Sequence, residues 1–241
     1  TAHLLEFRNI RIVYDNAIEA IRDVSIAVPE GGIVALLGSN GAGKSTLLKA
    51  IFGMVKVRGG SVEVNGESIV GLKADQLVHR GVGFVPQTNN VFPSLTIEEN
   101  LQMGIIQRPK AYKERLEFVT GIFSELGGRL KQRAGSLSGG ERQMVAMSRA
   151  LMMEPSVLLL DEPSAGLSPV RQDDAFIRVS DINKAGVTTI MVEQNARRCL
   201  QICDRGYVLD QGRDAYHGTG RELLNDPKVI GLYLGTLGQE D

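Results

Sequence analysis

The sequence predicts an α/β fold in which a mostly parallel core sheet carries a phosphate-binding loop. An apolar run at 33–37 leads into a glycine-rich stretch at 38–45, and a helical pattern follows it from 46 to 52. A second apolar run at 157–160 ends in two carboxylates. Runs of this length are typical of buried strands, and strands buried on both faces are typical of parallel sheets.

Composition limits the kind of protein. The 241 residues carry 27 basic and 28 acidic side chains, so a net charge of −1 argues against nucleic acid as a partner. No apolar stretch approaches the ~18 to 20 residues of a membrane-spanning helix, and no signal peptide is recognisable at the start. Without a linker or repeat, we expect one domain over 1–241. Cys199 and Cys203 are too few ligands for a zinc site and fit buried small residues.

The first part of the chain predicts strands. Residues 4–14 alternate imperfectly between apolar and polar, and a second strand at 21–28 is closed by a Pro-Glu-Gly-Gly turn. Residues 61–64 and an Asn-Gly turn at 65–66 complete an antiparallel β region. We expect this region to lie around the phosphate loop.

The stretch at 38–45 matches the G-x-x-x-x-G-K-[ST] pattern, and its flanking strand and helix are the context that this motif needs. Its glycines bring backbone N–H groups onto phosphate oxygens, and the helix N-terminus adds partial positive charge. Lys44 would reach the β- and γ-phosphates, and the Ser45 hydroxyl would bind Mg²⁺. The predicted nucleotide contacts are Gly38, Ser39, Asn40, Gly41, Ala42, Gly43, Lys44, Ser45 and Thr46.

The middle of the chain predicts an inserted helical subdomain at about 88–153. A short buried strand at 81–87 ends in Gln87, and a helical block runs from about 97 to 133. Ser138 then opens a further helix at 142–153, so that Ser138, Gly139 and Gly140 form an N-cap. Such an N-terminus also suits an anion. Two anion sites could serve one nucleotide if two chains meet face to face.

The run at 157–160 ends in Asp161 and Glu162, which fit a carboxylate that holds Mg²⁺ through water and a general base for the attacking water. A strand at 188–194, a hairpin at 207–217 and a terminal helix at 221–233, interrupted near Pro227, follow. The polar residues at the strand ends should meet at one edge of the sheet, where open α/β sheets bind ligands. They are Gly38, Gln87, Asp161, Glu162 and Gln194.

Taken in order, these motifs resemble the ATPase subunit of an ATP-binding-cassette (ABC) transporter over essentially the whole chain. The resemblance implies an ABC-ATPase fold and a head-to-tail dimer, in which Ser138, Gly139 and Gly140 of each chain contact the γ-phosphate held by the other. It implies that Gln87 approaches Mg²⁺ and the attacking water, and that Gln194 takes the place of a switch residue. It also implies that Tyr14 stacks on adenine, and the less favoured alternative is an ordinary tyrosine at a strand end.

Finer features resemble the smaller ATPase of branched-chain amino acid importers: 165–169, 192–196 and 233–235. Urea and short-chain amide importers share them, so the solute stays open. The resemblance implies ATP and Mg²⁺ as cofactors and a peripheral location on the cytoplasmic face of the membrane. The implied partners are transmembrane permease subunits, a second ABC ATPase subunit, identical or related, and indirectly a solute-binding protein. We expect the permease to contact residues 87–103, with Val91, Phe92 and Leu95 as apolar anchors.

Three residues depart from the broad family pattern. Glu141 stands where glutamine is usual, Ser168 where aspartate is common, and Gln194 where a histidine is usual. Because an amide cannot become a cation, we expect activity to depend little on pH between about 6 and 7.5.

The alternatives are an ATPase of a lipid or lipopolysaccharide transporter and, in another class, a DNA-repair or chromosome ATPase. The latter typically carries coiled-coil arms or zinc modules, for which the segment 87–137 is short.

Overall fold

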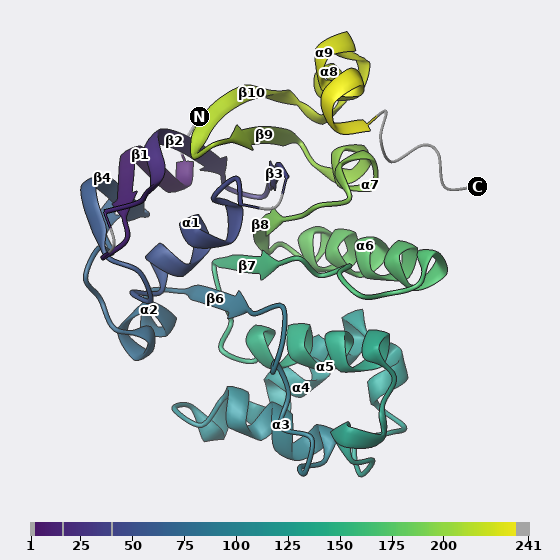
Figure 1. The fold of residues 1–241 in the computed structure, drawn as a ribbon. Coiled ribbons are helices and arrows are strands. Elements are labelled where there is room, and N and C mark those ends of the chain that lie inside the picture. Colours follow the sequence, from purple (N-terminus) through teal and green to yellow (C-terminus); the bar gives the residue numbers. More distant parts are fainter. Residues whose placement is uncertain (1–2, 16, 40, 235–241) are drawn as a thin grey trace.

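The computed structural model describes residues 3–15, 17–39 and 41–234, and a six-stranded sheet forms its centre (Figure 1). The strand order is β10-β9-β3-β8-β7-β6. The five strands from β9 to β6 are parallel, whereas β10 pairs antiparallel with β9 as a hairpin. This confirms the predicted α/β fold with a mostly parallel core sheet. The strands are β3 (Ile33–Leu37), β6 (Val82–Val85), β7 (Val157–Asp161), β8 (Thr188–Val192), β9 (Arg205–Asp210) and β10 (Arg213–Thr219).

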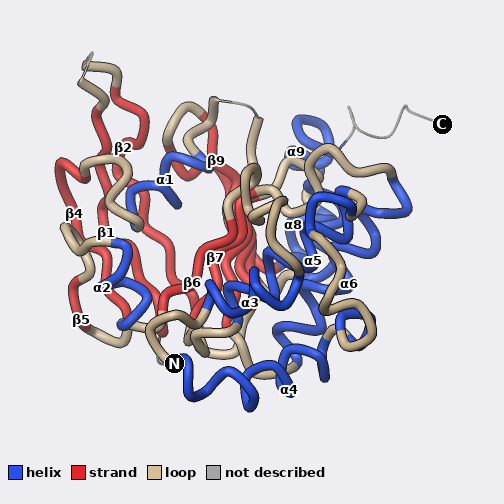
Figure 2. The backbone as a smooth tube through the Cα atoms, turned by 90° about the horizontal axis from the view of Figure 1, so that it is seen from below, coloured by secondary structure: helices blue, strands red, loops and turns tan. Residues whose placement is uncertain are grey.

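A second sheet is antiparallel throughout, in the order β2-β1-β4-β5. It lies on one side of the core sheet together with helices α1 and α2, and the remaining helices lie on the other side (Figure 2). Its strands are β1 (His3–Val13), β2 (Glu19–Pro29), β4 (Val57–Val64) and β5 (Glu67–Ser68). The antiparallel region expected from the first part of the chain is therefore present.

The core strands are apolar without interruption because both of their faces are covered. In β3, Val34 and Leu36 pack into a cluster with the antiparallel sheet and α1 (Lys44–Ile51). Ile33, Ala35 and Leu37 face the opposite cluster, which is built from the helices. Successive side chains of a strand point to opposite faces, so a strand between two layers must be apolar at every position.

The helices follow the predicted segments with shifted boundaries. They are α2 (Ala74–His79), α3 (Ile97–Gly104), α4 (Tyr112–Ile122), α5 (Gly139–Leu151), α6 (Pro169–Lys184), α7 (Ala196–Ile202), α8 (Gly220–Asn225) and α9 (Pro227–Val229). Short 3₁₀ turns occur at Pro109–Ala111, Ser124–Leu126 and Ala134–Ser136, and a π-helical turn at Ile230–Leu234. No helix of the described residues is long and apolar enough to cross a membrane.

Two expectations about helices need correction. The block predicted at 97–133 is two helices separated by a 3₁₀ turn that starts at Pro109, and α4 ends before the glycines at 127–128. The helix predicted from Arg142 begins at Gly139, because the Ser138 hydroxyl accepts a hydrogen bond from the Glu141 N–H and caps the first turn.

Candidate active site at the carboxyl edge of the core sheet

The phosphate-binding loop connects β3 to α1, and two of its glycines are required by space as well as by backbone angle. Gly38 has a φ of 150°, and a Cβ there would lie 2.4 Å from the Leu209 carbonyl oxygen. Gly43 has a φ of 101°, and its Cβ would lie 2.5 Å from Ile21 Cδ1. Asn40, a predicted contact, lies outside the described residues. The loop is therefore packed tightly against its neighbours at both ends.

The start of α1 is open to an anion. Gly43 is its N-cap, and no side chain caps the helix. Ser39 and Gly41 are exposed beside it, whereas Ala42 is buried. Uncapped N–H groups at a helix start point at whatever lies in front of them and favour negative charge.

Lys44 lies inside the site rather than at its surface. Its side chain is 4% exposed, its Nζ donates a hydrogen bond to the Gly38 carbonyl, and Nζ is 3.9 Å from Glu162 Oε1. Burial lowers the pKa of the Lys44 ammonium, and the negative charge of Glu162 acts in the opposite direction. The lysine is thus held between the phosphate loop and the end of β7.

Ser45, on the first turn of α1, donates its hydroxyl proton to Asp161 Oδ1 across 2.9 Å. Asp161 is the last residue of β7 and is 5% exposed. Glu162 follows with a positive φ of 46°, and its N–H donates to the Val192 carbonyl at the end of β8. The left-handed backbone of Glu162 and this hydrogen bond fix the direction in which the chain leaves the sheet. They therefore also fix the position of the Glu162 carboxylate.

Gln87 is exposed two residues beyond β6, on the edge of the sheet where Gly38, Asp161 and Glu162 also lie. A hollow of about 200 Å³ is lined by Gln87, Glu162 and Gly139, among others. The structure therefore brings the end of β6, the end of β7 and the start of α5 to one space. At the start of α5, Ser138 and Gly139 are exposed and Gly140 is buried.

Ser138 and Glu141 form a complete capping box at the start of α5. Glu141 Oε1 accepts from the Ser138 N–H at 3.2 Å, and Ser138 Oγ accepts from the Glu141 N–H at 3.3 Å. Glu141 also pairs with Arg129. The hydrogen bond from Ser138 and the Arg129 guanidinium lower the pKa of the Glu141 carboxyl.

Tyr14 and Gln194 are the remaining predicted site residues. The Tyr14 hydroxyl is 2.7 Å from Thr46 Oγ1 on α1, and the tyrosine is 39% exposed. Gln194 is exposed two residues beyond β8. Among the described residues, no side-chain hydrogen bond or ion pair joins Gln194 to Lys44, Ser45, Asp161 or Glu162. Only the order of the parallel strands places Gln194 at the same edge of the sheet.

Sequence reasoning missed Glu193, which immediately precedes Gln194 and is 1% exposed. Its burial raises the pKa of the carboxyl, although hydrogen bonds from Ser164 and neighbouring N–H groups act against the rise. The sequence did contain a signal for Glu193. It is an acidic residue that ends an apolar run, as Asp161 is after residues 157–160.

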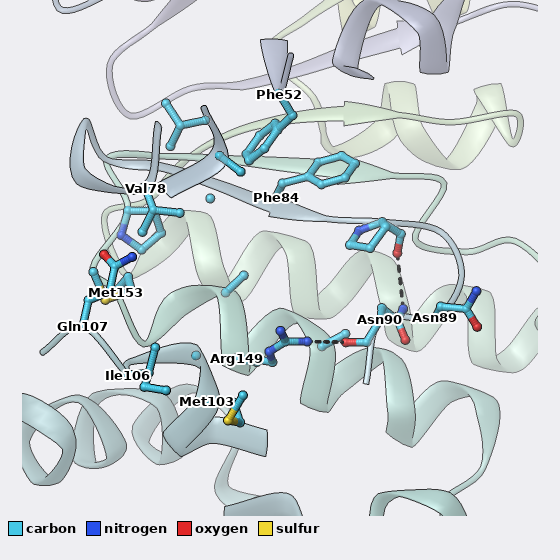
Figure 3. A pocket seen from close by; sticks show the side chains of 18 of the residues that line it. Phe52, Val78, Phe84, Asn89, Asn90, Met103, Ile106, Gln107, Arg149 and Met153 are labelled. Atoms are coloured by element: carbon cyan, nitrogen blue, oxygen red, sulfur yellow. Dashed lines mark hydrogen bonds between the residues drawn. The ribbon is translucent and has the colours of Figure 1, made fainter. Parts of the chain in front are cut away.

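A larger hollow, of about 450 Å³, lies between the core sheet and α3 and α5 (Figure 3). Phe52 and Phe84 form one wall with their ring centroids 4.7 Å apart, and Met103 and Ile106 face them (Figure 3). Arg149 Nη1 donates to the Asn90 carbonyl across this space at 3.3 Å. Of the expected anchors, Val91 packs against the core and Phe92 lies 4.7 Å under the Arg149 guanidinium.

Comparison with known proteins adds a family and several relatives. The family described as ABC transporter matches residues 21–165. BraG of Pseudomonas aeruginosa, a high-affinity branched-chain amino acid transport ATP-binding protein, is 44% identical over 96% of this chain and 100% of its own length. The probable branched-chain amino acid transport ATP-binding protein LivF of Archaeoglobus fulgidus is 43% identical over 88% of this chain and 91% of its own. A crystal structure of the ADP conformation of MJ1267, an ATP-binding cassette of an ABC transporter, superposes with a TM-score of 0.86, 30% identity and coverage of 98% and 100%.

Proposed function

The chain belongs to the ABC transporter family as an ATP-hydrolysing subunit, and we propose that it powers the uptake of a small solute, with branched-chain amino acids as the first candidates. The observation that carries the proposal is the cluster of Lys44, Ser45, Asp161 and Glu162 at the mouth of the phosphate loop. These side chains are the cation, the hydroxyl and the two carboxylates that phosphoryl transfer from ATP needs.

ATP would bind along the phosphate loop. In our proposal, the N–H groups at 38–46 bind the phosphates, and Lys44 leaves the Gly38 carbonyl to contact the β- and γ-phosphates. Tyr14 would stack on adenine, and its hydrogen bond to Thr46 supports this because it keeps the ring beside α1.

The donor set at the end of β7 fits Mg²⁺. Ser45 Oγ and Asp161 Oδ1 are 2.9 Å apart, and hard oxygen atoms of this kind are the ligands that Mg²⁺ takes, together with water and phosphate oxygens. We propose that Ser45 ligates the ion, that Asp161 holds it through water and that Gln87 approaches it. The ion would supply positive charge against the β- and γ-phosphates.

Glu162 is the proposed general base. Its carboxylate is buried enough to be held in place, with 13% of its side chain exposed, and it opens to the hollow shared with Gln87. There it would accept a proton from the water that attacks the γ-phosphate. Gln87 would orient that water, and the amide of Gln194 would donate to the γ-phosphate.

The second nucleotide contact would come from another subunit. Ser138 and Gly139 are exposed, so a γ-phosphate on a second ATPase subunit could reach the exposed start of α5. We propose a head-to-tail dimer in which Ser138, Gly139 and Gly140 act in trans, with residues 88–153 as the subdomain that carries them. The second subunit is either a copy of this chain or a related ATPase.

The proposed contact with the membrane partner is the hollow between Phe84 and Ile106 (Figure 3). From the expected range of 87–103, Asn89, Asn90 and Met103 line it. An apolar hollow with a few polar groups suits a short segment of permease. Arg149 and Asn90 connect it to the loop of Gln87, and this would place the chain peripherally on the cytoplasmic face of the membrane.

The solute itself would be selected by the permease and by a solute-binding protein. The names of BraG and LivF support branched-chain amino acids, because both are branched-chain amino acid transport proteins that this chain covers almost completely. Uptake of labelled leucine and of labelled urea by cells that carry the complete transporter separates the two candidate solutes. Leucine uptake alone supports the proposal, and urea uptake alone contradicts it.

The experiment that tests the mechanism compares Glu162→Gln with the wild type. With Mg-ATP, the variant should lose at least about 100-fold in turnover, keep its nucleotide affinity and elute as a dimer in size-exclusion chromatography. Turnover at the wild-type rate would exclude Glu162 as the base. Loss of turnover in a species that stays monomeric with ATP at high concentration would keep the base and assign the second subunit to a related chain.

A further inference from the structure

Glu193 is a buried carboxylate that the proposed chemistry does not use. It follows the last residue of β8, and its N–H donates to the Leu36 carbonyl at 3.0 Å, at the end of β3 just before the phosphate loop. Burial disfavours the charged form of such a group, so it is retained only where its oxygens are satisfied.

The carboxylate satisfies the backbone of two separate loops. Oε1 accepts from the Ser164 N–H at 2.9 Å, two residues after Glu162. Oε2 accepts from the N–H groups of Gln194 and Asn195 at 3.1 and 3.2 Å. One side chain therefore connects the loop of the proposed base to the loop of the proposed γ-phosphate contact.

A second connection runs outside the first. The Asn195 amide donates to Gln172 Oε1 at 3.1 Å, and Gln172 Nε2 donates to the Leu167 carbonyl at 3.1 Å. Leu167 lines the hollow that contains Glu162. The Glu162 N–H also donates to Val192. The loop after β7 and the loop after β8 are thus joined by several hydrogen bonds, and Glu193 is the buried side chain among them.

The arrangement requires the shape and chemistry of glutamate. An ionised carboxylate has two oxygens that only accept, which matches three N–H groups. In glutamine, one oxygen is replaced by an NH₂ group that would face an N–H donor. Aspartate keeps both oxygens but is one methylene shorter, so it cannot reach Ser164 and its own loop together.

We propose that Glu193 is a positioning residue for ATP hydrolysis, which holds Glu162 and Gln194 in fixed relation through the backbone of Ser164 and of its own loop. This inference rests on the proposed function, because it assigns Glu162 and Gln194 the roles given above. Glu193 touches neither nucleotide nor water in this scheme. Its effect should therefore fall on kcat and leave nucleotide binding nearly unchanged.

The test measures kcat and KM for ATP and the Kd of a fluorescent ATP analogue for Glu193→Gln and Glu193→Asp. Glu30→Gln is the matched control, because Glu30 is exposed in the turn before β3, at the end of that strand opposite the phosphate loop. We expect kcat to fall at least about tenfold in both Glu193 variants, with Kd within about threefold of the wild type. The control should behave as the wild type.

Three results would overturn the inference: a wild-type kcat in both variants, a loss of nucleotide affinity in parallel with kcat, or failure of both variants to fold. The last two would indicate a purely structural residue. The Glu193→Gln/Gln194→Ala double variant adds an independent readout, since misplacing Gln194 should make its removal cost less than in the wild type. Full additivity would contradict the coupling. Absence of ATP turnover in the wild type would reject the proposed function instead.

Discussion

The Ser45 hydroxyl donates to Asp161 Oδ1 at 2.9 Å, although the two residues are 116 positions apart in the sequence. The contact joins the first turn of α1 to the last residue of β7. It places a hydroxyl and a carboxylate oxygen where one small cation could be held by both. The two motifs that sequence reasoning treats separately are thus one structural unit.

Asp161→Asn should therefore weaken the binding of Mg²⁺ without removing the nucleotide site. Asparagine keeps the shape and an acceptor for Ser45 but loses the charge that holds the cation. We expect the Mg²⁺ concentration for half-maximal ATPase activity to rise about tenfold or more, as for residues that hold a metal through its ligands. A titration of activity with Mg²⁺ at saturating ATP measures this, and metal-free nucleotide binding serves as the control. An unchanged Mg²⁺ requirement would contradict the assignment.

Gly38→Ala should destabilise the protein much more than Gly41→Ala. Both residues have positive φ, but an added Cβ meets the Leu209 carbonyl oxygen at 2.4 Å at Gly38 and nothing within 4 Å at Gly41. The unfavourable backbone angle costs roughly 1–3 kcal/mol at either position, and Gly38 adds a clash that only backbone movement relieves. Urea unfolding of the two variants gives the difference. Equal losses would show that the loop adapts to the clash.

Glu141→Gln should change how stability depends on pH. The pKa of Glu141 is lowered from its ordinary value of 4.5, chiefly by the hydrogen bond with Ser138 and also by Arg129. The ionised carboxylate therefore stabilises the folded state above pH 4.5, and this contribution is lost as the pH falls through the lowered pKa. Since the pair of Glu141 and Arg129 is at the surface, we expect the charge to contribute less than about 1 kcal/mol to the free energy of unfolding.

The measurement is the difference in unfolding free energy between wild type and Glu141→Gln from pH 7 downward. The difference should be largest at neutral pH and approach zero in acid. A difference that stays constant with pH would contradict a contribution from the charge of Glu141. Glutamine retains those bonds, so it isolates the contribution of the charge.

The sequence was sufficient to predict the strands of the core, and the proposed site follows from where those strands end. Lys44, Ser45, Asp161 and Glu162 were assigned to one site because each follows or opens a buried element, and parallel strands end at one edge. Their mutual contacts confirm that these four lie together. The hydroxyl cap of Ser138 was also predictable, since it depends only on residues within one turn.

The helical segments between β6 and β7 were less predictable for a physical reason. A loose helical period runs through 97–133, and it shows neither the end of α3 at Gly104 nor the end of α4 at Ile122. The role of Glu193 was missed because its partners come from loops after β7 and β8. These loops become neighbours only once the two strands pair, and nothing in the spacing of Ser164 and Glu193 indicates it.

Gln194→His should introduce a pH dependence that the wild type lacks. The Gln194 amide has the same charge at every pH, whereas a histidine becomes a cation below an ordinary pKa near about 6.5. At saturating Mg-ATP, we expect the wild-type kcat to be nearly flat between about pH 6 and 7.5 and the variant to show an inflection in that range. A wild-type inflection that disappears when His3, His79 or His217 is replaced would contradict this prediction. Because Gln194 is exposed two residues beyond β8, the substitution should leave the fold intact. An unfolding midpoint equal to that of the wild type at each pH checks that the new pH dependence is not an effect of stability.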